Sequence, residues 1–247
     1  MTAPEPHRSV EPPEAVARPV MRQRWEDLAY LHRRIEPDVV QKALPRGLEV
    51  DTFDGSAWVG LVPFRMVGIA PPVGPAVPYF GTFPETNIRT YVIGPEGPGV
   101  WFNSLDVSRL LPVTVARLTY RLPYFWGNVG IRRTGDRAVY TTRRRWPGPR
   151  GVRSRVVIDV GGPIAEPDDL DVFLTARWGL YTVLRRSLAY APVDHAPWPL
   201  HAAEAPVVDD ELMAAAGYRE PSGPWHVRWS PGVAVRVGRP RRVGRVR

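Results

Sequence analysis

The sequence predicts a mainly β protein of the α+β class, in which antiparallel strands form a barrel or sandwich with a few short helices against it. Two observations lead to this expectation. The 29 prolines and 22 glycines are spread along the whole chain of 247 residues, which indicates many short elements joined by turns. The order of patterns along the chain contains many strand-like segments and few helical ones.

The N-terminal half begins with residues 1–20, a proline-rich lead with few large apolar groups that is expected to be disordered. A short helix is predicted over residues 37–44, with a proline in its first turn. An Asp54-Gly55 turn and a proline-rich loop over residues 69–78 separate the strands. The strands expected here span residues 25–35, 48–52, 57–64 and 100–103, together with the stretch that contains Glu85.

The C-terminal half is expected to continue in the same way. Residues 139–146 and 152–160 have the pattern of a hairpin, joined across the proline- and glycine-rich residues 147–151. Further strands are predicted over residues 178–186, 200–203 and 225–237, and short helices over residues 168–176 and 209–216. We expect one domain over residues 21–240, followed by a basic disordered tail over residues 241–247.

The charge of the chain first suggests a polyanionic partner. The net charge is +8, and 32 of the 33 basic residues are arginine, Lys42 being the one lysine. A genome-level bias towards arginine codons is the favoured explanation, and acidic residues are interspersed over most of the chain. Because no zinc-finger spacing, helix-turn-helix pattern or aromatic RNA-binding signature is present, nucleic-acid binding is disfavoured.

Several other classes of protein are disfavoured by composition. The chain has no cysteine, which excludes disulfides, thiolate chemistry and sulfur ligands. The histidines are scattered without metal-ligand spacing, so no metal site and no cofactor are expected. No run of about 18 apolar residues suggests a membrane span, and the first twenty residues lack the apolar core of a signal peptide. Cytoplasmic residence is therefore the default expectation.

One stretch, residues 83–124, carries the residues of greatest chemical interest. Side chains alternate between the two faces of a strand, so Glu85, Asn87, Arg89 and Tyr91 are expected to share one face. Such a polar row on a strand with an apolar or threonine-lined back either faces solvent or lines a wet cavity.

A helix is expected to follow this strand pair. Ser104 or Asp106 is suited to cap it, and Pro112 should break or kink it. Arg117 and Tyr120 lie on the same helical stripe as Asp106, and a basic residue on an apolar stripe needs a polar or anionic partner.

Four short motifs are specific enough for comparison with known families. They are Leu-Pro-Arg-Gly-Leu-Glu-Val-Asp at 44–51, Glu-Thr-Asn-Ile-Arg-Thr-Tyr at 85–91, Phe-Asn-Ser-Leu-Asp at 102–106 and Leu-Pro-Tyr at 122–124. In this order they resemble the YqjF-like family of uncharacterised proteins, part of the acetoacetate decarboxylase-like superfamily. The resemblance covers roughly residues 22–238. It implies a cone-shaped, largely antiparallel β barrel around an internal pocket.

The resemblance also bears on chemistry. Decarboxylases of the superfamily carry a Schiff-base lysine beside a second lysine, a pocket glutamate and a pocket arginine, and Glu85 lies where the glutamate would fall. The lysine pair would fall within residues 106–112, which contain no lysine. A Schiff base requires a primary amine that can lose its proton, and a guanidinium cannot supply one. Lysine-dependent decarboxylation is therefore not expected.

The leading hypothesis is a pocket inside the barrel that binds a small carboxylic acid or carbonyl compound. Glu85 is the candidate acid/base group of a lysine-independent reaction. The candidate ligand-binding residues are Asn87, Arg89, Tyr91, Arg117, Tyr120 and Tyr124. Three alternatives stay open at this point: the polar row forms structural ion pairs, Arg117 pairs with Asp106 or Glu85, and the tyrosines simply pack.

Two further classes of function remain as alternatives. The same pocket could serve a non-catalytic ligand-binding or regulatory module, or the arginines could serve a nucleic-acid-associated protein. No membrane partner is expected, and a homo-oligomer is left open.

Overall fold

The computed structural model describes residues 9–109, 122–219 and 221–245, and these form a mainly β fold with short helices. The first half contains β1 (Pro19–Ile35), α1 (Pro37–Ala43), β2 (Glu49–Val50), β3 (Ala57–Ala70), β4 (Phe83–Gly94) and β5 (Gly97–Val107). The middle contains β6 (Tyr124–Thr134), β7 (Arg137–Trp146), β8 (Arg153–Pro163) and α3 (Asp169–Thr175). The last third contains β9 (Gly179–Leu184), β10 (Ser187–His195), β11 (His201–Asp210), α4 (Leu212–Ala215), β12 (Ser222–Gly238) and β13 (Arg241–Arg245).

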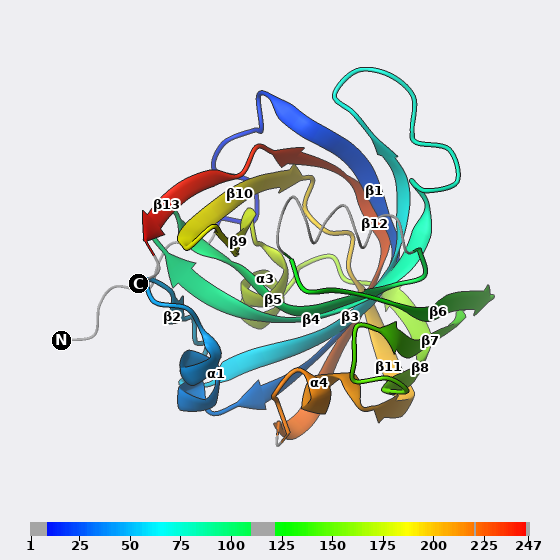
Figure 1. Ribbon diagram of the computed structural model, residues 1–247. Helices are drawn as coiled ribbons and strands as arrows, with labels where there is room; N and C mark the ends of the chain where they lie inside the picture. The colour runs from blue at the N-terminus through cyan, green and yellow to red at the C-terminus, as the bar shows by residue number, and fades with distance from the viewer. Residues whose placement is uncertain (1–8, 110–121, 220, 246–247) are drawn as a thin grey trace.

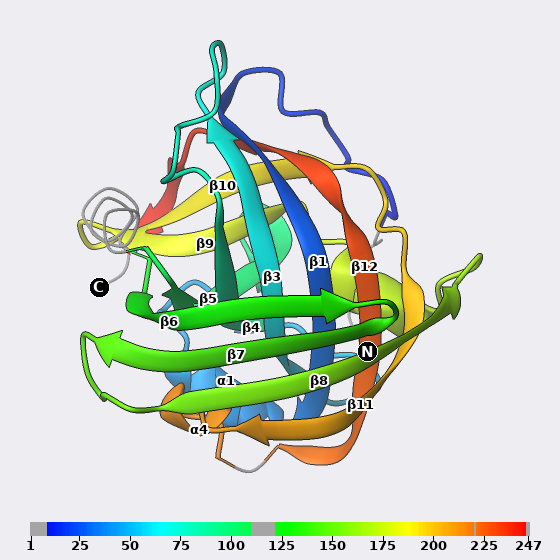
Figure 2. The ribbon, with the colours of Figure 1, turned by 90° about the vertical axis from the view of Figure 1, so that its right-hand side faces the viewer.

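The strands close into two rings that share one sheet. The shared part has the order β12-β1-β3-β4-β5, in which every neighbouring pair is antiparallel. Strands β9 and β10 connect β5 back to β12, which closes a ring of seven strands. Strands β6, β7, β8 and β11 connect the same two strands on the other side, which closes a ring of nine. Figure 1 shows β9 and β10 above β4 and β5, and Figure 2 shows β6, β7, β8 and β11 crossing in front of the shared sheet.

Strand β4 separates the two interiors because its side chains alternate in direction. Ile88 packs in the main apolar core, and the Thr86 hydroxyl bonds to that of Thr142 on β7, so this face belongs to the nine-strand ring. Glu85 and Asn87 project from the other face, into the seven-strand ring. Of the four residues expected to share one face, Glu85, Asn87 and Arg89 line this interior, whereas Tyr91 does not.

The nine-strand ring is filled by the largest apolar core. Buried side chains from β1, β3, β7, β8 and β12 meet there, among them Leu31, Val59, Tyr140, Ile158 and Trp229, and α4 adds Leu212 and Met213. Within this core, Asp106 of β5 accepts two hydrogen bonds from Arg144 of β7, at 2.8 and 2.7 Å, and both side chains are almost fully buried. A charged pair that is both bidentate and buried holds β5 against β7.

This pair explains why one sequence-based expectation is wrong. Ser104 and Asp106 do not cap a helix, because both lie within β5, which continues to Val107. The local pattern suits a cap, but the partner of Asp106 is 38 residues away and only the tertiary fold supplies it. The rest of the expected helix, including Pro112, lies outside the described residues.

The two ends of the chain also differ from expectation. The expected disordered tail over residues 241–247 is wrong for Arg241–Arg245, which forms β13 and pairs with β10. Val243 packs against the buried cluster that contains Leu188 and Tyr190 of β10, so the strand has an apolar contact as well as its hydrogen bonds. The expected disorder of residues 1–20 is wrong near its end, because Val16 is buried and β1 begins at Pro19.

The short helices lie near the predicted positions. Pro37 occupies the first turn of α1, and the Asp168 side chain caps α3 by accepting a hydrogen bond from the Asp171 N–H at 2.7 Å. The N-cap residue of α4 is Glu211, and the carboxylate of the preceding Asp210 accepts from the Met213 N–H at 3.0 Å. Among the described residues, no helix is long and apolar enough to cross a membrane.

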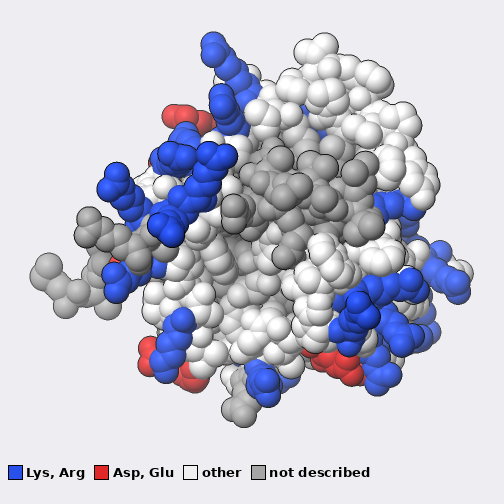
Figure 3. Space-filling model, in the orientation of Figure 1, with Lys and Arg blue, Asp and Glu red and all other residues white. Residues whose placement is uncertain are grey.

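Positive charge on the surface is divided between separate areas. Figure 3 shows basic side chains over β6–β8 on one side of the molecule and over β10 and β13 on the other. Exposed arginines at the first area include Arg143 and Arg145, and those at the second include Arg241 and Arg242. The face between them is largely without charge among the residues described, so this view shows no continuous basic stripe.

The buried pair on β7 can be tested against an exposed pair on the same strand. Arg144→Ala leaves the Asp106 carboxylate buried without its partner and is expected to lower the free energy of unfolding by about 3–5 kcal/mol. Arg137→Ala breaks the solvent-exposed pair with Asp159 and should change it by less than about 1 kcal/mol. Urea unfolding at neutral pH measures both, and equal losses would contradict the structural role given to Arg144.

Candidate functional site

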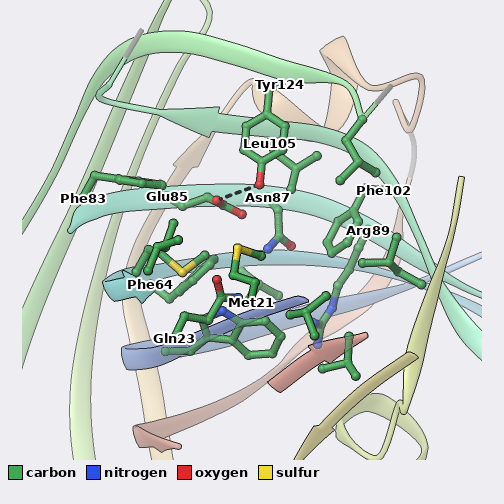
Figure 4. A pocket seen from close by; sticks show the side chains of 18 of the residues that line it. Met21, Gln23, Phe64, Phe83, Glu85, Asn87, Arg89, Phe102, Leu105 and Tyr124 are labelled. Atoms are coloured by element: carbon green, nitrogen blue, oxygen red, sulfur yellow. Dashed lines mark hydrogen bonds between the residues drawn. The ribbon is translucent and has the colours of Figure 1, made fainter. Parts of the chain in front are cut away.

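The seven-strand ring encloses a cavity of about 360 Å³. Its walls are predominantly apolar, and most of them come from β1, β3, β4, β5 and β10 (Figure 4). The apolar lining residues are Met21, Trp25, Leu28, Val62, Phe64, Met66, Ile69, Val77, Phe80, Phe83, Phe102, Leu105, Leu122, Leu180, Ala191, Val193, Trp198 and Val237. The polar lining residues are Gln23, Glu85, Asn87, Arg89 and Tyr124. A concave apolar site with a few polar groups is the usual form of a small-molecule site.

Glu85 is the acidic group in the cavity lining. It is only 2 % exposed, and burial raises the pKa of its carboxyl to about 8. Hydrogen bonds from Asn87 and Tyr124 oppose this rise, the latter at 3.5 Å between the Tyr124 Oη and Glu85 Oε2, whereas the charge of Asp106 adds to it. No cation among the described residues forms a salt bridge with Glu85. The carboxyl is therefore mostly protonated at neutral pH and can donate a hydrogen bond.

Three further polar atoms lie buried beside the cavity without a hydrogen-bond partner in the described part of the chain. They are the Oδ1 of Asn87, the Oε1 of Gln23 and the Nε1 of Trp25. Figure 4 shows Glu85 and Asn87 projecting from β4 towards Gln23 and Met21 of β1. Because buried polar groups are normally hydrogen-bonded, these atoms mark places where the polar group of a ligand could bind.

Arg89 forms a second polar region, further along β4. Its Nε donates to the Tyr91 Oη at 3.2 Å and its Nη2 donates to the Leu174 carbonyl at 3.3 Å, so the guanidinium turns towards α3. It also lies over the rings of Tyr30 and Tyr91. No carboxylate in the described ranges pairs with it, and residues 110–121 contain no Asp or Glu. A cavity-lining guanidinium without an acidic partner is a suitable anchor for an anion.

Tyr91 lies behind this region and does not line the cavity. It is fully buried, and its Oη shares a 2.6 Å hydrogen bond with the Nε2 of His32. Burial lowers the pKa of His32 well below its usual range, and the charges of Arg89 and His226 lower it further, so the imidazole is neutral. His32 lies across Gly60, where a β-carbon would come within 2.6 Å of its Nε2.

The sequence-predicted site residues therefore fall into three groups. Glu85, Asn87, Arg89 and Tyr124 line the cavity, and Tyr91 packs behind Arg89. Arg117 and Tyr120 lie outside the described residues, so whether they reach the cavity stays a prediction. The suggested pairing of Arg117 with Asp106 competes with the bidentate contact that Asp106 already makes to Arg144.

The sequence interpretation missed Gln23, Trp25 and His32. All three lie on β1, and Gln23 and Trp25 are two residues apart on the face that lines the cavity. The alternation from Met21 to Trp25 was a usable signal, but the predicted strand began only at Trp25. The alternative that the polar row forms structural ion pairs does not hold for Glu85 and Arg89, because Arg89 is bonded to Tyr91 and Leu174 instead.

Among the described residues, neither the lysine of the chain nor a cluster of metal ligands contributes to the cavity. Lys42 is exposed on α1 and is not among the residues that line the cavity. Within the described ranges, no group of three His, Asp or Glu side chains could hold a metal ion.

Solved structures with the same fold define the class of protein. MppR, described as an enduracididine biosynthesis enzyme complexed with pyruvate, has a TM-score of 0.65 at 15% identity, with 94% of each chain covered. An acetoacetate decarboxylase-like enzyme from Sphingomonas wittichii RW1 has a TM-score of 0.64 at 14% identity, covering 94% of this chain and 96% of that one. An acetoacetate decarboxylase has a TM-score of 0.65 at 13% identity, covering 96% and 92%. The fold is thus that of the acetoacetate decarboxylase-like proteins.

Within this class the chain belongs to the DUF2071 family of uncharacterized conserved proteins, whose family model matches residues 22–234. It is 34% identical over 203 residues to the uncharacterized protein YqjF of Bacillus subtilis (strain 168), covering 82% of this chain and 84% of YqjF. The resemblance identified from the four sequence motifs is confirmed.

The raised pKa of Glu85 predicts a pH dependence of stability. An unfolded glutamate releases its proton near pH 4.3, whereas Glu85 in the folded chain keeps it to about pH 8. In this window the folded state holds more protons, so stability falls as pH rises. Relative to Glu85→Gln, the wild type should lose about 1.4 kcal/mol per pH unit within the window.

Urea unfolding at several pH values measures this difference. Glu204→Gln, which replaces an exposed glutamate on β11, controls for the change in charge. A difference between wild type and Glu85→Gln that stays flat with pH would contradict the protonated state of Glu85.

Proposed function

We propose that the cavity of the seven-strand ring binds a small carboxylic acid or carbonyl compound, and that Glu85 acts on it as an acid/base group. The observation that carries the proposal is the buried carboxyl of Glu85, which has a pKa of about 8 at the wall of an apolar cavity. Perturbed carboxyls in a cavity are candidates for acid/base chemistry because their pKa lies near the working pH.

The surroundings of Glu85 suit a carbonyl group. In its protonated form the carboxyl donates a hydrogen bond to a carbonyl oxygen, and the Asn87 amide and the Tyr124 hydroxyl lie beside it. The apolar walls strengthen such a bond because they exclude competing water. At neutral pH about a tenth of the molecules carry the Glu85 carboxylate, which can accept a proton from the carbon next to a carbonyl.

Arg89 supports the carboxylic-acid part of the proposal. Its guanidinium stays charged under all physiological conditions, and no acidic side chain in the described ranges neutralises it. Since the cavity reaches Arg89, the carboxylate of a ligand is a suitable counter-ion.

The position of Lys42 supports chemistry without a Schiff base. A carbonyl group held in the cavity cannot be attacked by an amine that is exposed on α1. MppR, whose structure holds pyruvate, indicates that this fold can accommodate an oxo acid. In the chain described here the proposed reaction is proton transfer, such as enolisation, with Glu85 carrying the proton.

A non-catalytic ligand-binding or regulatory module would use the same cavity. The two functions differ in whether the ligand changes chemically while it is bound. Exchange of carbon-bound hydrogen for deuterium distinguishes them, because enolisation exchanges these atoms and simple binding does not.

The test uses 2-oxobutanoate and levulinate as probes in D₂O, with NMR detection of deuterium at the carbons next to the oxo group. The wild type should accelerate exchange, and Glu85→Gln should slow the catalysed exchange about a hundredfold or more, because an amide cannot take the proton. Lys42→Gln should leave the rate unchanged.

Thermal unfolding with and without each probe measures binding in the same samples. Stabilisation without exchange would favour the non-catalytic module. Neither stabilisation nor exchange with any oxo acid would overturn the proposed function.

A further inference from the structure

The two polar regions of the cavity are separated, and this separation limits the shape of a ligand. Glu85 and Arg89 lie four residues apart on β4, a distance of about 13 Å along the strand. The guanidinium bonds to Tyr91, which lies still further from Glu85, so it turns away from the carboxyl rather than towards it. One compact polar group cannot satisfy both regions at once.

We propose, on the basis of the proposed function, that the ligand is an elongated and largely apolar carboxylic acid. Its carboxylate binds Arg89, its apolar body fills the middle of the cavity, and an oxo or hydroxyl group at its far end bonds to Glu85. A compact 2-oxo acid, whose two polar groups are adjacent, fits one region and leaves the other without a partner.

The volume of the cavity supports a ligand of this size. At about 30 Å³ for each water in the liquid, 360 Å³ corresponds to roughly a dozen waters. A ligand of about a dozen non-hydrogen atoms is therefore of the right scale, which is about twice the size of the smallest oxo acids.

The side chains around the two polar regions are mostly apolar, so a ligand with a polar middle section would be unfavourable there. Phe64 lies opposite Glu85, Leu105 opposite Asn87 and Phe102 opposite Arg89 on the neighbouring strands, and a buried water needs about three hydrogen-bond partners that such apolar walls do not provide. Trp25 and Trp198 stack with their ring centroids 6.0 Å apart and add a flat apolar surface. Contact with a hydrocarbon chain or ring replaces poorly bonded water and is favoured.

The polar atoms at the two ends of the cavity suit the two different polar groups of the proposed ligand. The protonated Glu85 carboxyl can donate to an oxo or hydroxyl oxygen, and the Asn87 Oδ1 and Gln23 Oε1 can accept from a hydroxyl group. A carboxylate placed there would lie against the acceptor oxygens and would be unfavourable in an apolar surrounding. Arg89 is the cation among the described lining residues, so it is the favourable place there for the acidic end of the ligand.

The first experiment measures binding of straight-chain monocarboxylates from acetate to dodecanoate by isothermal titration calorimetry. Affinity should rise by about fourfold for each added methylene until the chain fills the cavity near decanoate, and then stop rising. Ala191→Leu, which narrows the cavity from β10, should move this limit to shorter chains without weakening acetate or pyruvate.

The second experiment tests the orientation with two isomers, 9-oxodecanoate and 2-oxodecanoate. The wild type should bind the 9-oxo isomer more tightly, because only this isomer places an oxo group near Glu85. Glu85→Met should remove the preference. Arg89→Gln should weaken both acids by about ten- to a hundredfold but leave 2-undecanone, which has no carboxylate, unaffected.

The outcomes separate this inference from the proposed function. Pyruvate or 2-oxobutanoate binding as tightly as decanoate, with exchange at their carbons, would overturn the elongated ligand and leave the proposed function in place. Rising affinity that is independent of Arg89 would overturn the orientation. No binding by any member of either series would overturn both.

Discussion

The structure depends on the alternation of side chains along β4, in a sheet whose two faces are both enclosed. In most antiparallel sheets one face meets the core and the other meets water. Here the shared sheet is a wall between two rings, so neither face of β4 is free. Thr86 and Ile88 must fit the packed nine-strand ring, and Glu85 and Asn87 must fit the cavity. A shift of one residue in register would exchange the two sets, which fixes the register strongly.

Charged side chains are bonded differently in the interiors of the two rings. On the packed side, Asp106 and Arg144 are bonded to each other through two contacts, so neither is left as an isolated ion. On the cavity side, Glu85 and Arg89 are not bonded to each other. Burial raises the pKa of Glu85, so its carboxyl keeps its proton. Arg89 cannot lose its charge; its guanidinium donates to the Tyr91 hydroxyl and the Leu174 carbonyl and lies over the rings of Tyr30 and Tyr91. The charged pair thus holds the framework together, whereas Glu85 and Arg89 at the cavity have no ionic partner among the described residues.

The features that depend on neighbouring residues alone could be predicted from the sequence. The polar row on β4 follows from the two-residue period alone, and the helices at Pro37 and Asp168 follow from local capping and proline signals. The barrel itself could be named only through the resemblance of four motifs to a known family, since periodicity does not distinguish a barrel from a sandwich. The parts that failed depend on distant partners: Asp106 continues a strand because of Arg144, and Arg241–Arg245 becomes a strand because β10 offers a free edge and Val243 has an apolar neighbourhood.

The cavity residues on β1 show a further limit of sequence reasoning. Gln23 lies between residues that look like a surface strand, and nothing near it in the sequence indicates a cavity. Its position follows from the pairing of β1 with both β3 and β12, which curves the strand around the ring. When a site is formed by several strands of a barrel, sequence analysis can recognise the strand that carries most of the polar residues. The strands on the opposite wall have no such pattern and are missed.

The cavity also has an energetic consequence that connects fold and function. An empty apolar space lowers stability because its walls lack contacts, and each unpaired buried polar atom lowers it further. A fold that kept such a space without use could gain stability by filling it with larger side chains, and Ala191 and Val62 offer places to do so. A ligand that supplies the missing contacts binds only the folded state. At concentrations above its Kd it raises the free energy of unfolding in proportion to the logarithm of its concentration. The contacts and hydrogen bonds that the cavity walls do not make to one another are those that a ligand would complete, which is why the binding of a ligand and the stability of this barrel should be coupled.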